Sequence, residues 1–383
     1  MSCDKLFEII NSLEEKYLQF LVDVCDIESP TEHKEGVDKV GKYFIKKAEE
    51  KGWEIEQQTQ PVSGNCICIT LNPKASGQPV CFSGHMDTVH PIGSFGEKPT
   101  KIDGDIIYGP GVIDCKGGLV ASFMAMDALE QCGFKERPVK LILQSDEENG
   151  SRFSNKSTVA FMAEKAKGCI AFLNTEPHTG GCICVARQGI RKYAYEVFGK
   201  AAHSGVCYKG KSAILEASHK IIELEKYKDG NAITCNCGLI NGGTAENTVP
   251  DKCVFTADFR FKNESQATQV ESIAKKIAEE SFVEGTSCNL VLKSWRYSME
   301  KNQTNVLLYD KVNAIYKEAG LPVLTASESN GGADSADMAH AGLPCLDGLG
   351  AQGGKIHTVE EFMYKKSLVE SAKRLASVAY CIK

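Results

Sequence analysis

Apolar residues follow two alternating spacings along the first 186 residues of the chain. Helical spacing predicts helices at 6–24, 37–51, 117–131 and 158–167. Short apolar runs predict strands at 55–71 (with a break at Gly64), 80–84, 139–144 and 169–174. The turn-rich stretch 91–111 carries two hairpin signals, at Gly93 and at Asp103-Gly104. Strands that alternate with helices predict an α/β fold with a mostly parallel sheet and helices on both faces.

The pattern changes near Arg187. From there the predicted elements are a strand at 190–198, a helix at 212–225, strands at 233–240 and 253–261, a helix at 265–281 and a strand at 288–292. This β-α-β-β-α-β order is the ferredoxin-like unit. A helix at 305–319, a strand at 344–346 and a helix at 366–380 then return to the first pattern. We therefore predict one α/β domain from 1–186 and 302–383, with a smaller α+β domain, 187–301, inserted.

Composition and charge exclude two classes of partner. The formal net charge is −6 and the chain has no basic tract, so a nucleic-acid partner is not expected. No apolar run approaches the ~20 residues that a membrane span needs. Residues 1–13 also lack the basic-then-apolar pattern of a signal peptide. We expect a cytoplasmic protein without a membrane partner.

The 17 cysteines are interpreted as mostly reduced core residues. Three pairs have i, i+2 spacing within apolar runs, which places both members on one face of a strand. These pairs are Cys66/Cys68, Cys182/Cys184 and Cys235/Cys237. No Cys-x-x-Cys pair is present to suggest a thiolate zinc site.

His85 and Asp87 follow the predicted strand at 80–84. Residues i and i+2 of a strand point to one face, so this imidazole and carboxylate can approach the same point. A metal-binding histidine commonly uses one ring nitrogen for the metal and the other for an outer carboxylate. The alternative is a surface loop with polar residues and no ligand.

Further acidic residues come just after other predicted strands or just before a helix. They are Asp114, Glu147, Glu148 and Glu176, and His357 could add a second imidazole late in the chain. In open α/β sheets, ligands bind outside the carboxyl ends of the strands. So many carboxylates at one edge would repel each other without cations, and mixed histidine and carboxylate ligation suits zinc, with manganese or cobalt as alternatives. Of the adjacent glutamates, one could bind metal while the other serves as a general base.

The chain resembles a known family across essentially its whole length. It is similar to the dizinc exopeptidases and deacylases, which include glutamate carboxypeptidase, aminoacylase, acetylornithine deacetylase and succinyl-diaminopimelate desuccinylase. The glutamate carboxypeptidases are the most similar group. The matching segments are 83–89 (SGHMDTV), 109–118 (GPGVIDCKGG), 146–150 (DEENG), 200–205 (KAAHSG), 246–250 (ENTVP), 258–260 (DFR) and His357.

The resemblance implies two metals, most simply zinc, bridged by Asp114. The implied ligands are His85, Asp114 and Glu176 for one metal and Asp114, Glu148 and His357 for the other. It further implies that Glu147 is the general base toward a metal-bridged water and that Asp87 orients His85. The peptide bond after Asp114 is expected to be cis.

The resemblance also gives roles to the inserted domain, which it implies is a lid and a dimerisation domain. His203 would reach the active site of the second subunit of a homodimer and, with Asn247, stabilise the oxyanion. Arg260 would bind the substrate carboxylate, for which a planar guanidinium is suited. Gly331 and Gly332 match a substrate-side turn.

The function expected from this resemblance is hydrolysis of an amide bond in a small peptide or an N-acyl amino acid. Carboxypeptidase or dipeptidase activity and deacylase activity stay open as alternatives. A competing motif is the phosphate-loop pattern at 205–212 (GVCYKGKS), although no apolar strand leads into its first glycine. Its other interpretation is a turn that opens a helix with Ser212 as the N-cap. A metal-binding relative without catalysis is a third class, but the presence of Glu147 argues against it.

Overall fold

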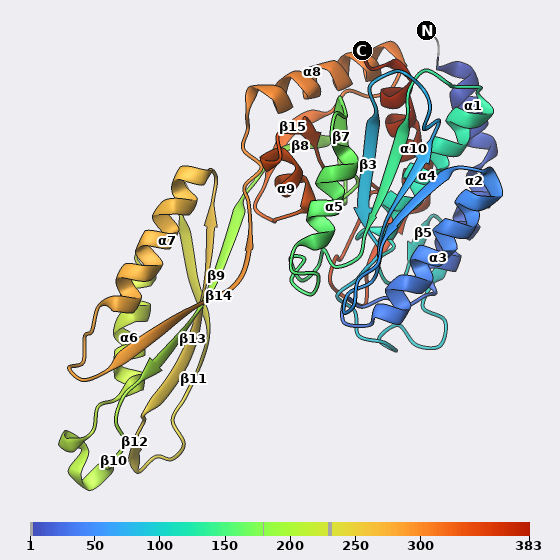
Figure 1. Ribbon diagram of the computed structural model, residues 1–383. Coiled ribbons are helices and arrows are strands. Elements are labelled where there is room, and N and C mark those ends of the chain that lie inside the picture. The colour runs from blue at the N-terminus through green and yellow to red at the C-terminus, as the bar shows by residue number, and fades with distance from the viewer. Residues whose placement is uncertain (1–2, 179, 229–231) are drawn as a thin grey trace. The chain divides into compact units, whose positions relative to one another are not determined.

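A computed structural model of the protein describes residues 3–178, 180–228 and 232–383 (Figure 1). The chain forms two compact units. The larger unit contains residues up to Val185, Lys301–Glu328 and Ala333–Lys383, and the inserted unit contains Ala186–Glu300 and Ser329–Gly332. The short segment 329–332 lies with the inserted unit because Gln188 and Arg187 bond to Ser329, whereas the division made from sequence places it in the larger unit.

The larger unit is built on a mixed six-stranded sheet of order β1-β2-β6-β3-β7-β16. Its strands are β1 (Glu54–Gln58), β2 (Cys66–Leu71), β3 (Val80–His85), β6 (Val139–Gln144), β7 (Ala171–Asn174) and β16 (Cys345–Leu346). β3 runs parallel to both β6 and β7, and β16 runs parallel to β7, whereas β1 and β2 join antiparallel. The predicted α/β fold is therefore confirmed, with an antiparallel edge on the parallel part.

Helices cover both faces of this sheet (Figure 1). They are α1 (Asp4–Ser12), α2 (Glu14–Cys25), α3 (Lys34–Lys51), α4 (Lys116–Gln131), α5 (Ser157–Ala166), α8 (Gln303–Glu318), α9 (Asp334–His340) and α10 (Lys365–Cys381). The predicted helix at 6–24 is two helices, which meet at Leu13. In β6, Leu141 and Leu143 point to the face of the sheet that α4 covers and belong to the core there. Ile142 lies between them and points to the opposite face, which α5 and α9 cover.

Smaller strand pairs complete the larger unit. A four-stranded sheet of order β17-β18-β5-β4 joins the strands β4 (Lys101–Asp103), β5 (Ile106–Tyr108), β17 (Gly353–Gly354) and β18 (Phe362–Tyr364), and β8 (Cys182–Arg187) pairs with β15 (Thr325–Ser329). The hairpin predicted at Asp103-Gly104 is confirmed as the β4–β5 connection. The hairpin predicted at Gly93 is wrong, because residues 91–96 form consecutive turns with no flanking strands.

The inserted unit is a four-stranded antiparallel sheet of order β11-β13-β9-β14 with two helices on one face (Figure 1). Its elements are β9 (Gly189–Phe198), β10 (Ala202–His203), the 3₁₀ helix η1 (Ser204–Lys209), α6 (Ala213–Leu224), β11 (Thr234–Gly242), β12 (Thr248–Val249), β13 (Lys252–Phe261), α7 (Glu264–Glu279) and β14 (Ser287–Arg296). Tyr195 and Phe255 stack at 4.6 Å in its separate core. The predicted ferredoxin-like order is confirmed.

All 17 cysteines are free, and eleven of them are buried. Cys66 and Cys68 are both buried on β2, as their spacing predicts. Among the described residues, no helix combines the length and the apolar character needed to cross a bilayer. The expected cytoplasmic location stays a prediction.

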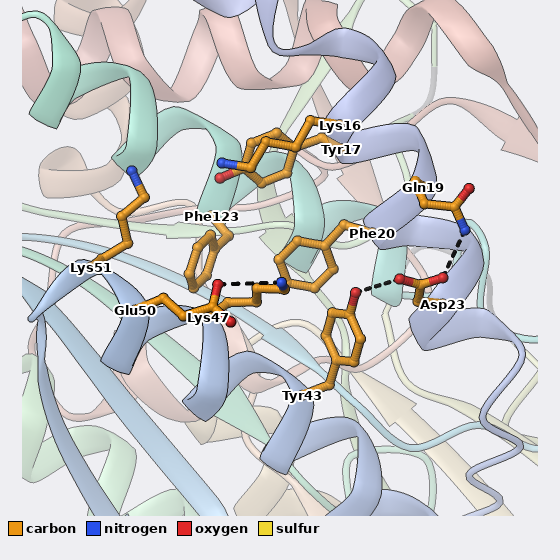
Figure 2. A pocket seen from close by; sticks show the side chains of 10 residues that line it. All are labelled: Lys16, Tyr17, Gln19, Phe20, Asp23, Tyr43, Lys47, Glu50, Lys51 and Phe123. Atoms are coloured by element: carbon orange, nitrogen blue, oxygen red, sulfur yellow. Dashed lines mark hydrogen bonds and ion pairs between the residues drawn. The ribbon is translucent and has the colours of Figure 1, made fainter.

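A cavity of about 330 Å³ lies between α2, α3 and α4 of the larger unit (Figure 2). Phe20 and Phe123 form its apolar wall, with ring centroids 5.4 Å apart. Beside it the buried Asp127 accepts hydrogen bonds from Lys16 and Tyr17, each at 2.8 Å, and from Lys51. The carboxylates of this region are bonded to neighbouring side chains, so we interpret it as part of the helix packing.

Candidate metal centre

The topology of the larger sheet brings several predicted site residues to one edge. β3, β6 and β7 are adjacent and parallel, so their carboxyl ends lie together. His85 is the last residue of β3, Glu147 and Glu148 follow β6 closely, and Glu176 comes two residues after the end of β7. This is the edge at which open α/β sheets bind ligands.

Asp114 and His357 reach the same point from loops. Asp114 lies in the turn before α4, and its peptide bond to Cys115 is cis, as expected. His357 lies between β17 and β18 with φ of 63°, in the left-handed region that L-residues seldom adopt. Both residues belong to the larger unit.

The two carboxylate oxygens of Asp114 face two different imidazoles. Oδ1 lies 3.1 Å from Nε2 of His85, and Oδ2 lies 3.3 Å from Nε2 of His357. Each imidazole has a second carboxylate beside it. Nε2 of His85 is 3.7 Å from Oε1 of Glu176, and Nε2 of His357 is 3.3 Å from Oε2 of Glu148.

Asp87 holds together the strand ends around these groups. Its carboxylate accepts hydrogen bonds from the backbone N–H groups of Glu147 at 3.1 Å and Glu148 at 3.2 Å, and from the Thr31 hydroxyl at 2.8 Å. Nδ1 of His85 lies 2.9 Å from the backbone oxygen of Asp87 and 3.4 Å from its carboxylate. Asp87 therefore orients the two glutamates through their backbone, a contact that the sequence motif alone does not indicate.

The electrostatics of the cluster reflect crowded carboxylates. Burial and the charge of Asp114 raise the pKa of Glu176 well above its usual range. Burial also works to raise the pKa of Asp114, but hydrogen bonds from His357 and His85 outweigh it and leave that pKa below its usual range. Hydrogen bonds to Asp114 and Glu148 raise the pKa of His357 to about 10. The carboxylates of the cluster thus favour positive charge between them.

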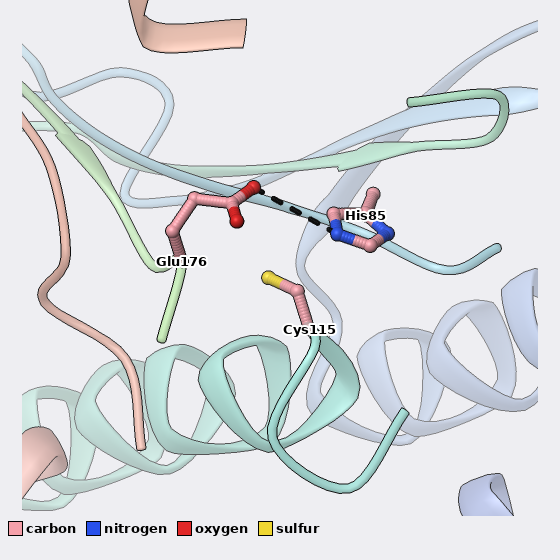
Figure 3. Close-up of side chains that lie close together, drawn as sticks. All are labelled: His85, Cys115 and Glu176. Atoms are coloured by element: carbon pink, nitrogen blue, oxygen red, sulfur yellow. Dashed lines mark ion pairs between the residues drawn. The ribbon is translucent and has the colours of Figure 1, made fainter. Parts of the chain in front are cut away.

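Cys115 lies beside His85 and Glu176 and belongs to a group that could hold a metal (Figure 3). Its thiol donates a hydrogen bond to the backbone oxygen of Thr175 at 3.2 Å, and burial raises its pKa well above the usual value. A protonated, bonded thiol is a weak ligand. Gly84 allows this close packing, since an added Cβ would lie 2.8 Å from the sulfur.

The residues fit a pair of divalent metals. Oε1 of Glu176 is buried and makes no hydrogen bond, although it points into the cluster beside His85. Two imidazoles and several carboxylates form the mixed nitrogen and oxygen donor set that zinc and its neighbours accept. A buried carboxylate oxygen without a hydrogen bond is costly, and a cation bound beside it would offset that cost.

The remaining predicted site residues lie in the inserted unit and form two groups. His203 and Asn247 are exposed neighbours: β10 pairs with β12, and the Ser204 N–H donates to the Asn247 backbone oxygen at 2.9 Å. Arg260 is paired with Asp258 at 2.7 Å, and its Nη1 lies 3.4 Å from the backbone oxygen of Asn330.

Gly331 and Gly332 follow Asn330 and therefore lie near Arg260. Arg187 donates to the Gly331 backbone oxygen at 3.3 Å. An added Cβ on Gly332 would come within 2.8 Å of Ile190 and 2.9 Å of Arg296, so this segment packs tightly against the inserted unit.

The phosphate-loop interpretation of 205–212 does not hold. A two-residue strand and then the 3₁₀ helix η1 occupy this region, so no long strand leads into the first glycine. The Gly210 N–H bonds to Cys207 and the Lys211 N–H to Lys200, which leaves them unavailable to a phosphate. Ser212 caps α6 as predicted, because its hydroxyl accepts from the Leu215 N–H at 3.2 Å.

Comparison with known proteins supports the same interpretation. The chain is 25% identical over 361 residues to carboxypeptidase G2 of a Pseudomonas species, covering 92% of this chain and 86% of that protein. It is 25% identical to succinyl-diaminopimelate desuccinylase of Dinoroseobacter shibae, over 73% of this chain and 77% of that one. The structure of aminopeptidase PepT from Bacillus cereus has a similar fold, with TM-score 0.78, 22% identity and coverage of 96% and 98%.

The sequence pattern of one family extends over most of the chain, from residue 81 to residue 380, and is described as peptidase family M20/M25/M40. This match includes every metal-cluster residue described above. The resemblance drawn from the motifs is confirmed. The chain therefore belongs to peptidase family M20/M25/M40 and is a metal-dependent peptidase or amidohydrolase of that family.

Proposed function

We propose that the protein hydrolyses an amide bond in a small peptide or an N-acyl amino acid, using two divalent metals that are most simply zinc, with cobalt or manganese as alternatives. The observation that carries the proposal is the placement of Asp114 between two imidazoles, each of which has its own glutamate. One metal would be held by His85, Asp114 and Glu176, and the other by Asp114, Glu148 and His357.

The bound metals would lower the pKa of a water and polarise the carbonyl group of the substrate. Glu147 is the general base: it takes a proton from the attacking water and returns it to the leaving nitrogen. Its side chain is buried at the same edge, and Asp87 fixes its backbone. Asp87 also sets the tautomer of His85 together with its own backbone oxygen.

In this proposal the protein is a homodimer, and His203 and Asn247 stabilise the oxyanion in the site of the other subunit. Support comes from the inserted unit, where β11 is an edge strand with Leu239 71% exposed and Ile240 55% exposed. An exposed edge strand presents unpaired backbone N–H and C=O groups to which a strand of a second copy can pair, and the two apolar side chains would be covered by such pairing. The exposure of His203 and Asn247 leaves both side chains open to such a contact.

Arg260, Gly331 and Gly332 bind the substrate carboxylate in this proposal. Asp258 holds Nε and Nη2 of Arg260, which directs its remaining Nη1 toward the backbone at Asn330. Substrates whose terminal carboxylate is free should therefore be preferred over their amides. Among relatives, carboxypeptidase G2 suggests peptide-like substrates and the desuccinylases suggest N-acyl substrates, so both classes belong in a screen.

The first test is metal content by mass spectrometry after stripping and reloading with zinc. The proposal expects two metals per chain, a loss in Asp114→Ala, and hydrolysis of at least one dipeptide or N-acyl amino acid. Glu147→Gln should keep both metals yet lose several orders of magnitude in kcat, since only the proton acceptor changes. Absence of bound metal in folded protein, or a Glu147→Gln variant with near-normal turnover, would refute the proposal.

A further inference from the structure

Glu361 is a buried carboxylate outside the predicted site, with 1% of its side chain exposed. Its Oε1 accepts hydrogen bonds from the N–H groups of Ile113 at 3.0 Å and Asp114 at 3.1 Å. Its Oε2 accepts from the Gly111 N–H at 3.3 Å and lies 2.7 Å from Nε2 of His90. One side chain thus contacts four donors.

Three of these donors belong to the turn that carries Asp114. This turn lies between β5 and α4 and has no regular partner strand for its N–H groups. Gly111 adopts φ of 74°, and a Cβ there would lie 2.8 Å from Thr88. Successive N–H groups in such a turn form a concave anion site, which the Glu361 carboxylate fills from inside the protein.

The chain segment that holds Glu361 also holds His357. The Glu361 N–H donates to the Thr358 backbone oxygen, and the Thr358 N–H donates to that of Lys355, each at 3.1 Å. The strained position of His357 therefore lies within the turn that Glu361 anchors. His90, the fourth donor, comes from the loop after β3, which also carries Asp87.

We propose that Glu361 is a positioning residue that fixes Asp114 and His357 relative to each other. It would thereby preform the site of the second metal, the one that Asp114, Glu148 and His357 would hold. The inference rests on the two-metal site proposed above. Without this carboxylate, the turn before α4 loses its acceptor and the His357 turn loses its anchor. Outer residues that orient ligands typically change metal affinity by about 10–100-fold when they are replaced.

Glu361→Gln is a sharp test because it keeps size and shape. An amide has one acceptor oxygen, so its NH₂ group would face N–H donors where the carboxylate now accepts. We expect zinc at the second site to bind about 10–100-fold more weakly, measured by competition with a fluorescent chelator. The first zinc, held by His85, Asp114 and Glu176, should be affected less.

The matched control is Glu360→Gln, since Glu360 is the exposed neighbour paired with Lys355 at 3.0 Å. It should bind both zinc ions as the unaltered protein does. A double-mutant cycle with His357→Ala adds a readout that general destabilisation would not move. If Glu361 acts through His357 and Asp114, its effect on second-site affinity should be smaller once His357 is absent.

Unaltered second-site affinity in a folded Glu361→Gln variant would overturn the inference, as would full additivity with His357→Ala. If that variant does not fold, Glu361→Asp decides by the same titration: a weaker second zinc supports the inference and unchanged binding overturns it. Failure of the proposed function is separate, because the unaltered protein would then bind no zinc pair at all.

Discussion

Loading the metal centre should release protons, and the surroundings of the two imidazoles set the number. Hydrogen bonds to Asp114 and Glu148 raise the pKa of His357 to about 10. Burial opposes the charged form of His85, but its contacts with the carboxylates of Asp114 and Asp87 still raise its pKa well above the usual value. The raised pKa values favour the imidazolium form of each ring, in which both ring nitrogens are protonated. A nitrogen that binds a metal must lose its proton, so binding two metals should release about two protons, one from each ring.

Calorimetric titration of the stripped protein with zinc, in buffers of different ionisation enthalpy, measures this release. Affinity should rise with pH by about tenfold per pH unit for each proton displaced, until the pKa of the ring is passed. His357→Gln should release about one proton fewer than the unaltered protein. His219→Gln, in the inserted unit, is the control and should change nothing. Two bound metals without proton release, or equal release from His357→Gln, would refute the reasoning.

The raised pKa of His357 also makes the stability of the metal-free protein depend on pH. A raised pKa means that the charged His357 stabilises the folded state fully below its ordinary pKa of 6.5. That contribution is lost as the pH rises through about 10. Since half of the side chain is exposed, solvent screening keeps the effect small.

Three further predictions test other parts of the molecule. Asp127→Asn should lower the free energy of unfolding by about 2 kcal/mol at neutral pH. Burial alone would raise the pKa of Asp127, but the hydrogen bonds that its carboxylate accepts outweigh burial and lower the pKa from 3.8 to about 2. This loss should disappear as the pH falls from 3.8 through about 2, and a constant difference in urea unfolding would contradict it; the exposed Asp103→Asn is the control. Mixing inactive Glu147→Ala and His203→Ala chains should restore about a quarter of the activity if a dimer shares its sites, and no recovery after verified subunit exchange would exclude sharing. Arg260→Gln should raise KM for a peptide with a free terminal carboxylate but not for its amide, and equal changes in both would exclude carboxylate binding.

Much of the larger unit was predictable because its signals are local. The apolar runs that become β3, β6 and β7 end just before His85, Glu147 and Glu176, and parallel pairing then brings these residues together. Only the order of helices and strands was needed for that step. The ferredoxin-like order of the inserted unit was predictable in the same way, from segments of helical spacing that alternate with segments of strand spacing.

Other features depend on contacts that no local pattern records. Glu361 follows a turn and resembles any surface glutamate in the sequence, yet it contacts residues about 250 positions earlier. Asp87 contacts the backbone of Glu147, whereas its motif suggests only a role beside His85. The turns at 91–96 contain glycines that signal a hairpin, but no apolar strands flank them to form one. Long-range hydrogen bonding decides each case.

The division of the chain has a consequence for the order in which a growing polypeptide folds. The inserted unit draws almost all of its core from one continuous stretch, so it can close while synthesis continues. The larger unit cannot, because α10, which follows the inserted unit in the sequence, packs against α1 and α4, which precede it. Until α10 emerges, the apolar side of α4 stays uncovered and available to chaperones. Removal of α10 should therefore yield chains whose middle segment folds while the metal-binding part aggregates.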